Sequence, residues 1–302
     1  MDAEFSERLR VNLSEDAEEK ITNDTLCFEG EKPKYNTALN KFFQSYFSLA
    51  KHDENTAKKF GSLQRSIADK RVPYMDTKTM GLLNNARKTI FDVYEGRAGR
   101  FIKSVIEQYA SQHFLDREKA YFKETVETIE NAIRHREKLK IQLGEKVFAV
   151  RPYKILNDKQ STFNYLIGFS SQNGVEAENI ASMRLSRITS IKCTPDDGAI
   201  SIYEIDKIRD KIVSSGVAFL IEDAIKVVVK LTKKGRGLYA GHVLNRPIYL
   251  SIIGNEYEFK CTKKQAEAYF FKFGADAEVI EPLLLREEFI SKHKEALAKY
   301  TL

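Results

Sequence analysis

The spacing of hydrophobic residues near the middle of the chain predicts a small antiparallel sheet. Within residues 163–169, every second side chain is aromatic or large and aliphatic, so these side chains fall on one face of a strand. Further runs of strand-forming residues occupy 147–156 and 181–193. The polar segments between these runs contain Asn157-Asp158 and Asn173-Gly174, which favour turns. This pattern indicates a small antiparallel barrel or a curled sheet.

The N-terminal residues also alternate, and two helical stretches follow them. Apolar residues at 9, 11 and 13 are separated by polar ones, which predicts a strand with one buried face over residues 5–13. Ser14 is a suitable N-cap for a helix that runs to about residue 28. After a break that contains Gly30 and Pro33, a second helix is predicted from about residue 36.

Between residues 53 and 138, the hydrophobic residues recur mainly with the spacing of helices. Asp76 is placed to start one helix, and residues 101–109 form another. Asp116 is placed to cap a long helix that ends near residue 138. The polar residues 52–59 are expected to be a linker.

The C-terminal third contains both the hydrophobic spacing of helices and that of strands. We expect a helix at 202–213, a strand at 227–231, a hairpin around Gly254-Asn255, a helix capped by Thr262, a strand at 277–280 and a final helix at 284–300.

Composition limits the class of protein. A chain of 302 residues is long enough for two or three domains, and no apolar run approaches the roughly 20 residues that span a bilayer. The acidic N-terminus has no apolar signal core, so a cytoplasmic location is expected. The odd number of cysteines, three, suits reduced thiols. Residues 51–140 carry a net charge of +6, which favours a polyanionic partner or, equally, describes a solvated helical surface.

Residues that would support catalysis are not grouped in the sequence. None of the five histidines is separated from another histidine, or from a nearby cysteine, by the spacing of a metal-ligand motif. Nucleophile-elbow, phosphate-loop and dinucleotide-binding motifs do not occur. We therefore expect a protein that is not an enzyme and that uses no metal or cofactor.

The predicted sheet carries basic and aromatic residues that could bind a nucleic acid or a small ligand. Arginine side chains fork to phosphate or carboxylate, and tyrosine rings stack on bases. Arg184 and Arg187 are three apart, so on one strand they point to opposite faces, and Arg187 is the one we expect to bind. Alternatively the tyrosines belong to the core and the arginines pair with carboxylates. The candidate residues are Arg151, Tyr153, Tyr165, Arg184 and Arg187.

The first 50 residues resemble the ribbon-helix-helix family of DNA-binding proteins. A strand and two helices are too few to bury a core alone, and a lone strand needs a partner. Two copies that pair their strands would satisfy both needs, which predicts a homodimer. In that family the outward side chains of the strands enter the major groove, and here these are Arg8, Arg10 and Asn12. The alternative is an ordinary edge strand with solvated arginines.

The central residues resemble a WYL domain, a ligand-sensing, SH3-like small β-barrel. The resemblance lies in Arg151-Pro152-Tyr153, in Asn164-Tyr165-Leu166, where Asn164 takes the place of the expected Trp, and in residues 183–188. Residues 271–286 resemble the extension that accompanies WYL domains. This resemblance implies that the basic and aromatic positions of the sheet bind nucleotides or nucleic acid.

The whole chain resembles accessory proteins of type VI-D CRISPR systems. The expected class is α+β multidomain, with a ribbon-helix-helix at 1–52, a helical linker region at 53–138, a WYL barrel at 139–195 and an α/β extension at 196–302. The resemblance implies a non-catalytic homodimer that binds single-stranded RNA and stimulates an RNA-guided CRISPR RNase effector. The alternatives are a ligand-responsive transcriptional repressor that binds duplex DNA through the N-terminal strand, and a sensor of a small nucleotide.

Overall fold

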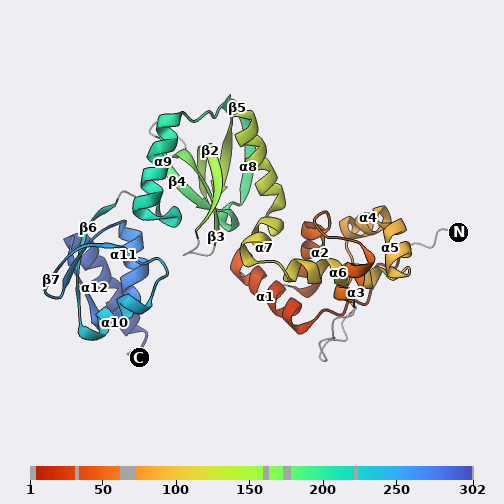
Figure 1. The fold of residues 1–302 in the computed structure, drawn as a ribbon, viewed down its shortest axis with the longest axis horizontal. Helices are drawn as coiled ribbons and strands as arrows, with labels where there is room; N and C mark the ends of the chain where they lie inside the picture. Colours follow the sequence, from red (N-terminus) through yellow and green to blue (C-terminus); the bar gives the residue numbers. More distant parts are fainter. Residues whose placement is uncertain are drawn as a thin grey trace. The chain divides into compact units, whose positions relative to one another are not determined.

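The chain divides into two compact units, Met1–Glu127 and Thr128–Leu302. Figure 1 shows a first unit made of helices, and a second unit that contains two β-sheets with their helices. This content agrees with the predicted α+β class. The computed structural model describes residues 5–30, 34–61, 72–158, 163–172, 178–220 and 224–300.

The helices of the first unit start largely where the sequence predicts. Ser14 caps the first helix by accepting the N–H of Ala17, and Gly30 ends it in the left-handed conformation. Asp76 caps α4 in the same way, through the N–H of Thr79. The described helices are α1 (Glu15–Glu29), α2 (Tyr35–Tyr46), α3 (Glu54–Gly61), α4 (Thr77–Asn85), α5 (Arg87–Tyr94), α6 (Ala98–Ala110) and α7 (Phe114–Tyr121). The next helix, α8 (Lys123–His135), begins in the first unit and ends in the second.

Three predictions about the helices of this unit are wrong. Residues 54–61 form α3 rather than a polar linker, and Asp53 accepts the N–H of Thr56 at its start. Asp116 lies in the first turn of α7 instead of capping it, because α7 begins after His113. The predicted long helix is also interrupted at Phe122, which separates α7 from α8.

The first unit is built around α6. Every residue from Phe101 to Ala110 is buried, so the helix is enclosed by its neighbours. The ring of Tyr109 in α6 lies 4.8 Å from the ring of Phe42 in α2, measured between the ring centroids. Aromatic pairs at such distances contribute about 0.5–1.5 kcal/mol beyond the area that they bury.

Two buried polar side chains of α6 hold the segments that surround it. Glu107 accepts the N–H of Ser14 at 2.6 Å and its hydroxyl at 2.7 Å. Gln108 accepts the N–H of Lys51 at 2.8 Å and donates to the carbonyl of the same residue at 3.0 Å. Buried polar groups need such partners. The contacts therefore fix the start of α1 and the segment after α2 against α6.

The N-terminal residues are extended, but the predicted strand at 5–13 does not form. Among the described residues this segment makes one isolated bridge, between Arg8 and Tyr74. On either side of this bridge, the Met75 N–H donates to the carbonyl of Glu7 at 2.7 Å and the Leu9 N–H donates to the carbonyl of Pro73 at 3.3 Å. The alternation in sequence instead reflects burial, because Val11 and Leu13 lie in the core of the first unit.

The N-terminal segment therefore already has a partner within its own chain. Gly99 of α6 approaches it so closely that an added Cβ would lie 2.4 Å from the carbonyl oxygen of Arg10. Any larger residue at this position would push the segment away from α6. The unpaired strand, from which we predicted a ribbon-helix-helix dimer, is absent from the described residues.

The first sheet of the second unit has the strand order β4-β3-β2-β1-β5, and all its pairs are antiparallel. The predicted third run is not one strand, because the short 3-10 turn η1 (Leu185–Arg187) divides it into β4 and β5. Among the described residues β4 and β5 do not pair, so this sheet is open. The predicted turn at Asn173-Gly174 lies outside the described residues. The strands are β1 (Glu137–Leu143), β2 (Lys146–Asp158), β3 (Phe163–Gln172), β4 (Asn179–Arg184) and β5 (Ser190–Asp197).

Helices lie on both sides of this sheet (Figure 1). On one side are α9 (Ile202–Ser215) and the 3-10 turn η2 (Val217–Phe219), and Ile208 of α9 is buried in a cluster with Phe169 of β3. On the other side α8 is joined to β5, where the Cys193 thiol donates to the carbonyl of Thr128 at 3.8 Å.

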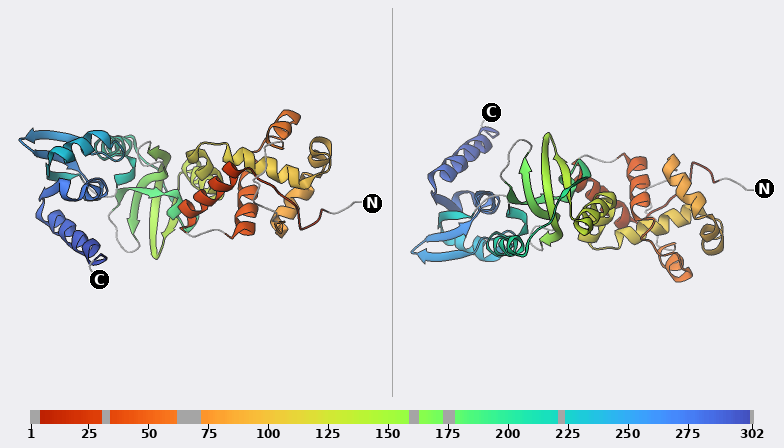
Figure 2. Two further views of the ribbon diagram at one scale, coloured as in Figure 1. Left: turned by 90° about the horizontal axis from the view of Figure 1, so that it is seen from below. Right: turned by 90° about the horizontal axis from the view of Figure 1, so that it is seen from above.

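The C-terminal extension contains a second antiparallel sheet, in the order β7-β8-β6-β9. The predicted hairpin is confirmed, with Gly254 at a φ of 64°, and Thr262 caps α11 as expected. The helix α10, capped by Thr232, was not predicted. Figure 2 shows the end of α12 projecting from its sheet, in keeping with the burial of only Leu285 and Phe289 along this helix. The elements are β6 (Ile225–Leu231), α10 (Lys233–Gly241), β7 (Tyr249–Ile253), β8 (Glu256–Cys261), α11 (Lys263–Phe270), the turn η3 (Phe271–Asp276), β9 (Ala277–Glu281) and α12 (Leu283–Ala298).

The buried ion pair of the first unit gives a stability prediction. Asp24 accepts hydrogen bonds from the Nε and one terminal nitrogen of Arg117, at 2.7 and 2.9 Å, and from the Tyr109 hydroxyl at 2.6 Å. Asp24→Ala leaves the Arg117 charge buried without its carboxylate. We expect the free energy of unfolding to fall by roughly 3–5 kcal/mol, measured by urea denaturation.

An exposed aspartate in the same helix serves as the control. Asp16 pairs with Lys20 at 2.8 Å, and its side chain is 68% exposed. Asp16→Ala should change the free energy of unfolding by less than about 1 kcal/mol. Equal losses for the two variants would show that the buried pair has no special role.

Candidate nucleic-acid interface

Arg151 lies at the centre of the predicted binding set, but two carboxylates hold it. Its Nε donates to Glu178 at 2.8 Å, and a terminal nitrogen donates to Glu204 at 2.6 Å. The other terminal nitrogen donates to the carbonyl of Ala199 at 2.7 Å. The side chain is only 14% exposed. Arg151 therefore joins β2 to α9 and to the residue before β4. This is the alternative given above, in which the arginines pair with carboxylates of the protein.

The ion pair also fixes the start of α9. Glu204 accepts the N–H of Ser201 at 2.8 Å, while the Ser201 hydroxyl accepts the N–H of Glu204, which completes a capping box. The hydrogen bond from Arg151, followed by that from Ser201, lowers the pKa of the Glu204 carboxyl to about 2. The hydrogen bond to Glu204 is in turn the main cause of a raised pKa for Arg151.

The two tyrosines of the predicted set belong to the core beneath α9. Tyr153 and Tyr165 are half-buried, and both pack against one apolar cluster. Their rings are therefore partly covered by protein, and they form no open stacking platform. The buried members of the cluster are Ile167, Phe169, Ile208, Val217 and Leu220.

The two remaining arginines do not share a strand. Arg184 ends β4, and its guanidinium carbon lies 3.2 Å from the centroid of the Phe163 ring. Arg187 ends the turn η1, so our assumption that both arginines lie on one strand is wrong. Arg187 is exposed and has no hydrogen-bond or ion-pair partner among the described residues. Within the predicted set, its charge is the one most open to a ligand.

The register of the first sheet brings together lysines that sequence reasoning missed. Lys140 of β1 lies directly opposite Lys192 of β5, and both are exposed. The same row continues through Ala149 of β2 to Ser171 of β3. We term these four residues the basic row. Like charges directly opposite each other on a sheet repel, and an anion bound between them would relieve that repulsion.

The turn that carries Arg187 adjoins the basic row. Thr189, two residues further on, donates its N–H and its hydroxyl to the carbonyl of Gln142 in β1, at 3.0 and 3.1 Å. Gln142 is two residues from Lys140 and therefore on the same face of β1. These contacts hold the backbone of the turn next to β1, close to the strand that carries Lys140.

The N-terminal candidates lie in the first unit and the sheet candidates in the second. Arg8 and Arg10 are exposed, and Asn12 is half-buried. The backbone on either side of Arg8 is hydrogen-bonded to the segment around Tyr74, so this stretch does not form the outer face of a paired ribbon in the described chain.

Other kinds of site have little support among the described residues. No group of three or more His, Cys, Asp or Glu side chains there could hold a metal ion. No helix in the described part of the chain has the length and apolar character to cross a membrane. The cysteines Cys27, Cys193 and Cys261 form no disulfide.

Comparison with known proteins shows a shared fold. No protein-family model and no curated protein matches the sequence. The crystal structure of a CRISPR Cas-related protein is similar over 98% of this chain and 95% of that chain, with a TM-score of 0.76 and 18% identity. Proteasome accessory factor B/C of Arthrobacter aurescens aligns with 76% of this chain and 37% of that chain, with a TM-score of 0.30 and 16% identity. At 18% identity, the first likeness establishes the fold.

The contact between Arg151 and Glu204 predicts a pH-dependent stability. The pKa of Glu204 is lower in the folded chain than in the unfolded one, so its stabilising effect is present above about pH 5 and is lost as the pH falls toward 2. We expect Glu204→Gln to lower the free energy of unfolding at pH 7, and we expect this difference from the unsubstituted protein to vanish near pH 2. Urea denaturation across this pH range measures it.

Glu287, exposed on α12, provides the matched control. Glu287→Gln should leave the free energy of unfolding nearly unchanged at every pH. A Glu204→Gln effect that persisted unchanged at pH 2 would contradict the role given to the ion pair.

Proposed function

We propose that this protein is a non-catalytic accessory protein of a CRISPR system, which binds single-stranded RNA and stimulates an RNA-guided RNase effector. The fold that it shares with a CRISPR Cas-related protein over nearly the whole chain supports the CRISPR association. The sequence resemblance to WYL-domain accessory proteins of type VI-D systems supports the more specific assignment.

The basic row is the observation that favours RNA binding. Two lysines face each other across β1 and β5, and neither has an ion-pair partner among the described residues. The small side chains of Ala149 and Ser171 continue the row, so a strand of nucleic acid could lie close to the sheet. Phosphate groups would neutralise the lysines and release counterions, the main source of affinity in such complexes. Arg187 adds an exposed guanidinium on the turn that precedes β5.

The alternative function, a repressor that reads duplex DNA, has less support. It requires two copies to pair their N-terminal strands and to present Arg8, Arg10 and Asn12 together. In the described chain this segment is bound to residues 73–75 and packed against α6, so that pairing would first have to break these contacts.

A homodimer remains part of the proposal, but its interface is expected elsewhere. The strand β7 lies at the edge of the second sheet, and all five of its residues are exposed. Ile248, Leu250 and Ile253 are 77%, 62% and 78% exposed. An exposed, apolar edge strand is a template for pairing with another chain. A second copy could pair its own β7 there in an antiparallel, two-fold arrangement.

The RNA site is tested by removing its charges. Lys140→Ala combined with Lys192→Ala should weaken the binding of single-stranded RNA, because two phosphate contacts are lost. The slope of log affinity against log salt concentration should become shallower by about 0.7 for each contact, or about 1.4 in all. Fluorescence polarisation of a labelled RNA at several salt concentrations measures both effects, and Arg187→Ala should act in the same direction.

Arg8→Ala combined with Arg10→Ala is the matched control, since it also removes two positive charges. It should leave RNA affinity nearly unchanged, and adding the same proteins to an RNA-guided RNase tests whether stimulation follows RNA binding. Loss of RNA binding in the N-terminal variant alone would show that the sheet is not the RNA site. Specific duplex binding that depends on Arg8 and Arg10 would favour the repressor.

The interface is tested by placing charges on β7. The unsubstituted protein should have about twice the 34.7 kDa mass of one chain in light scattering. Leu250→Asp with Ile252→Asp should give the single-chain mass, because two carboxylates would enter the apolar contact. Ile202→Asp, at a separate site that is 81% exposed, should leave the dimer intact. A dimer that survives the β7 substitutions would rule out this strand as the interface.

A further inference from the structure

Two uncharged polar side chains lie beside the basic row. Gln142 of β1 is opposite Ser190 of β5, and both residues are exposed. Each is two residues from a lysine of the row, Gln142 from Lys140 and Ser190 from Lys192, so all four lie on one face of the sheet. Two residues of a strand span roughly 6.5–7 Å. We term Gln142 and Ser190 the neutral pair, and it is the direct neighbour of the lysine pair.

The turn after β1 holds the Gln142 amide in one orientation. The Nε2 of Gln142 donates to the carbonyl of Gly144 at 2.9 Å. Gly144 has a φ of 59°, a conformation that glycine adopts readily, so the turn keeps this carbonyl in place. Because the nitrogen is engaged by the turn, the amide oxygen is left to accept a hydrogen bond from another molecule.

The Ser190 hydroxyl is the second group of the neutral pair. It has no hydrogen-bond partner among the described residues. A hydroxyl both donates and accepts. The ribose 2′-hydroxyl also donates and accepts, and it is the group by which a protein distinguishes RNA from DNA. An oriented amide oxygen and a hydroxyl beside two lysines are therefore suited to a ribose that adjoins a phosphate.

The second sheet has a similar lysine pair with different neighbours. Lys226 of β6 lies opposite Lys260 of β8. Carboxylate oxygens of Glu258 and Glu281 lie 3.6 and 3.5 Å from the Lys226 ammonium, so much of its charge is neutralised. The next pair along the two strands is Val228 and Glu258, which offers a carboxylate instead of neutral polar groups. The lysines of the second sheet are therefore a natural control for those of the first.

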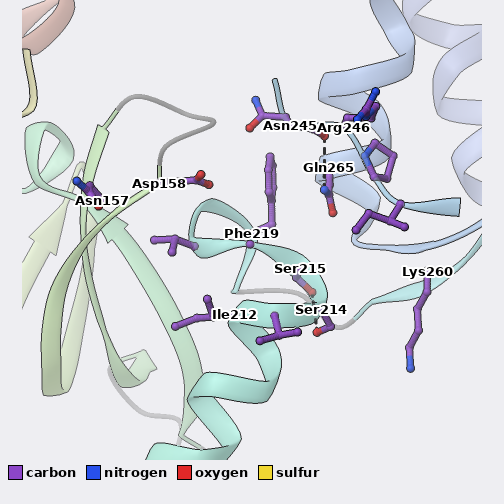
Figure 3. Close-up of a pocket in the computed structure, with 15 residues that line it drawn as sticks. Asn157, Asp158, Ile212, Ser214, Ser215, Phe219, Asn245, Arg246, Lys260 and Gln265 are labelled. Atoms are coloured by element: carbon purple, nitrogen blue, oxygen red, sulfur yellow. Dashed lines mark hydrogen bonds between the residues drawn. The ribbon is translucent and has the colours of Figure 1, made fainter. Parts of the chain in front are cut away.

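The polar pocket at the C-terminal end of α9 is a weaker candidate for a ligand site. It has a volume of about 340 Å³ and is lined by the end of β2, the end of α9 and the loop before β7. Figure 3 shows Lys260 extending away from Arg246 in this region. The amide oxygens of Asn245 and Gln265 have no partner among the described residues, but both are buried. A ligand in the pocket would not reach them, whereas the neutral pair is open to solvent.

We propose that Gln142 and Ser190 bind 2′-hydroxyl groups of the RNA whose phosphates the basic row holds, so that this face of the sheet selects RNA over DNA. The inference rests on the proposed RNA binding and adds the groups that distinguish the two nucleic acids. The lysines contact phosphate, which RNA and DNA share, and so they supply affinity without selectivity. The Gln142 oxygen accepts the 2′-hydroxyl proton, and the Ser190 hydroxyl can donate to a 2′-oxygen.

Three ligands with the same base test the chemistry by fluorescence polarisation on the full chain. Oligouridine should bind more tightly than oligodeoxyuridine of the same length, by roughly twofold to tenfold for each hydrogen bond that is lost. Oligouridine with 2′-fluoro groups keeps a ribose-like sugar shape but cannot donate from the 2′ position. It should bind no more tightly than the DNA.

Substitutions then locate the selectivity. Gln142→Met keeps the length of the side chain and should lower oligouridine affinity roughly twofold to tenfold. Affinity for oligodeoxyuridine and the dependence on salt should not change, because no charge is removed. Ser190→Ala should act in the same direction. Gln172→Met is the matched control, since Gln172 is exposed but follows Ser171 in β3 and so points to the opposite face. It should leave both affinities unchanged.

The charge variants separate this inference from the proposed function. Lys140→Ala with Lys192→Ala should weaken RNA and DNA binding alike, and Lys226→Ala with Lys260→Ala should change neither. Equal affinity of the unsubstituted protein for oligouridine and oligodeoxyuridine would overturn the inference while RNA binding stood. If Gln142→Met weakens both equally, Gln142 acts through the turn, and Ser190→Ala alone decides. Failure of the unsubstituted protein to bind either nucleic acid would refute the proposed function, and the inference with it.

Discussion

The ion pair between Arg151 and Glu204 is the contact on which the arrangement of the second unit depends. It holds the first turn of α9 against β2, while the apolar side of the same helix covers part of the sheet. A charge pair that is mostly withdrawn from water stabilises a fold only when its hydrogen bonds are nearly complete. Arg151 meets that condition with two carboxylates and a backbone carbonyl. The position of α9 then places its C-terminal end at the polar pocket.

The position of α9 also decides which cations of the sheet are open to a partner. Arg151 and the basic row lie on the same face, since Lys140 is opposite Ala149 and Ala149 is two residues from Arg151. The helix covers the part around Arg151 and leaves Lys140 and Lys192 exposed. Residues of similar charge therefore have different roles on one face. Arg151 is structural, and the lysines are available for phosphate.

In the first unit, polar side chains of a buried helix likewise fix the position of the neighbouring segments. The polar side chains of α6 bind the backbone at Ser14 and Lys51, and Gly99 lets the N-terminal segment lie directly on the helix. The likeness to a CRISPR Cas-related protein at 18% identity fits this picture, because a fold tolerates extensive substitution when the pattern of burial is kept. A shared fold does not imply shared site residues, because function depends on the particular side chains that a site brings together.

The sequence by itself determined the features that depend on neighbouring residues. Ser14, Asp76 and Thr262 cap helices as predicted, and Gly254 forms the predicted hairpin, because caps and turns are made within a few residues. Alternation showed that Val11 and Leu13 are buried, but it could not show against what. The tertiary structure decided the rest, since it alone sets which distant residues meet. It paired Arg151 with Glu204, set Lys140 opposite Lys192, and left the oxygen of Gln265 buried without a partner among the described residues.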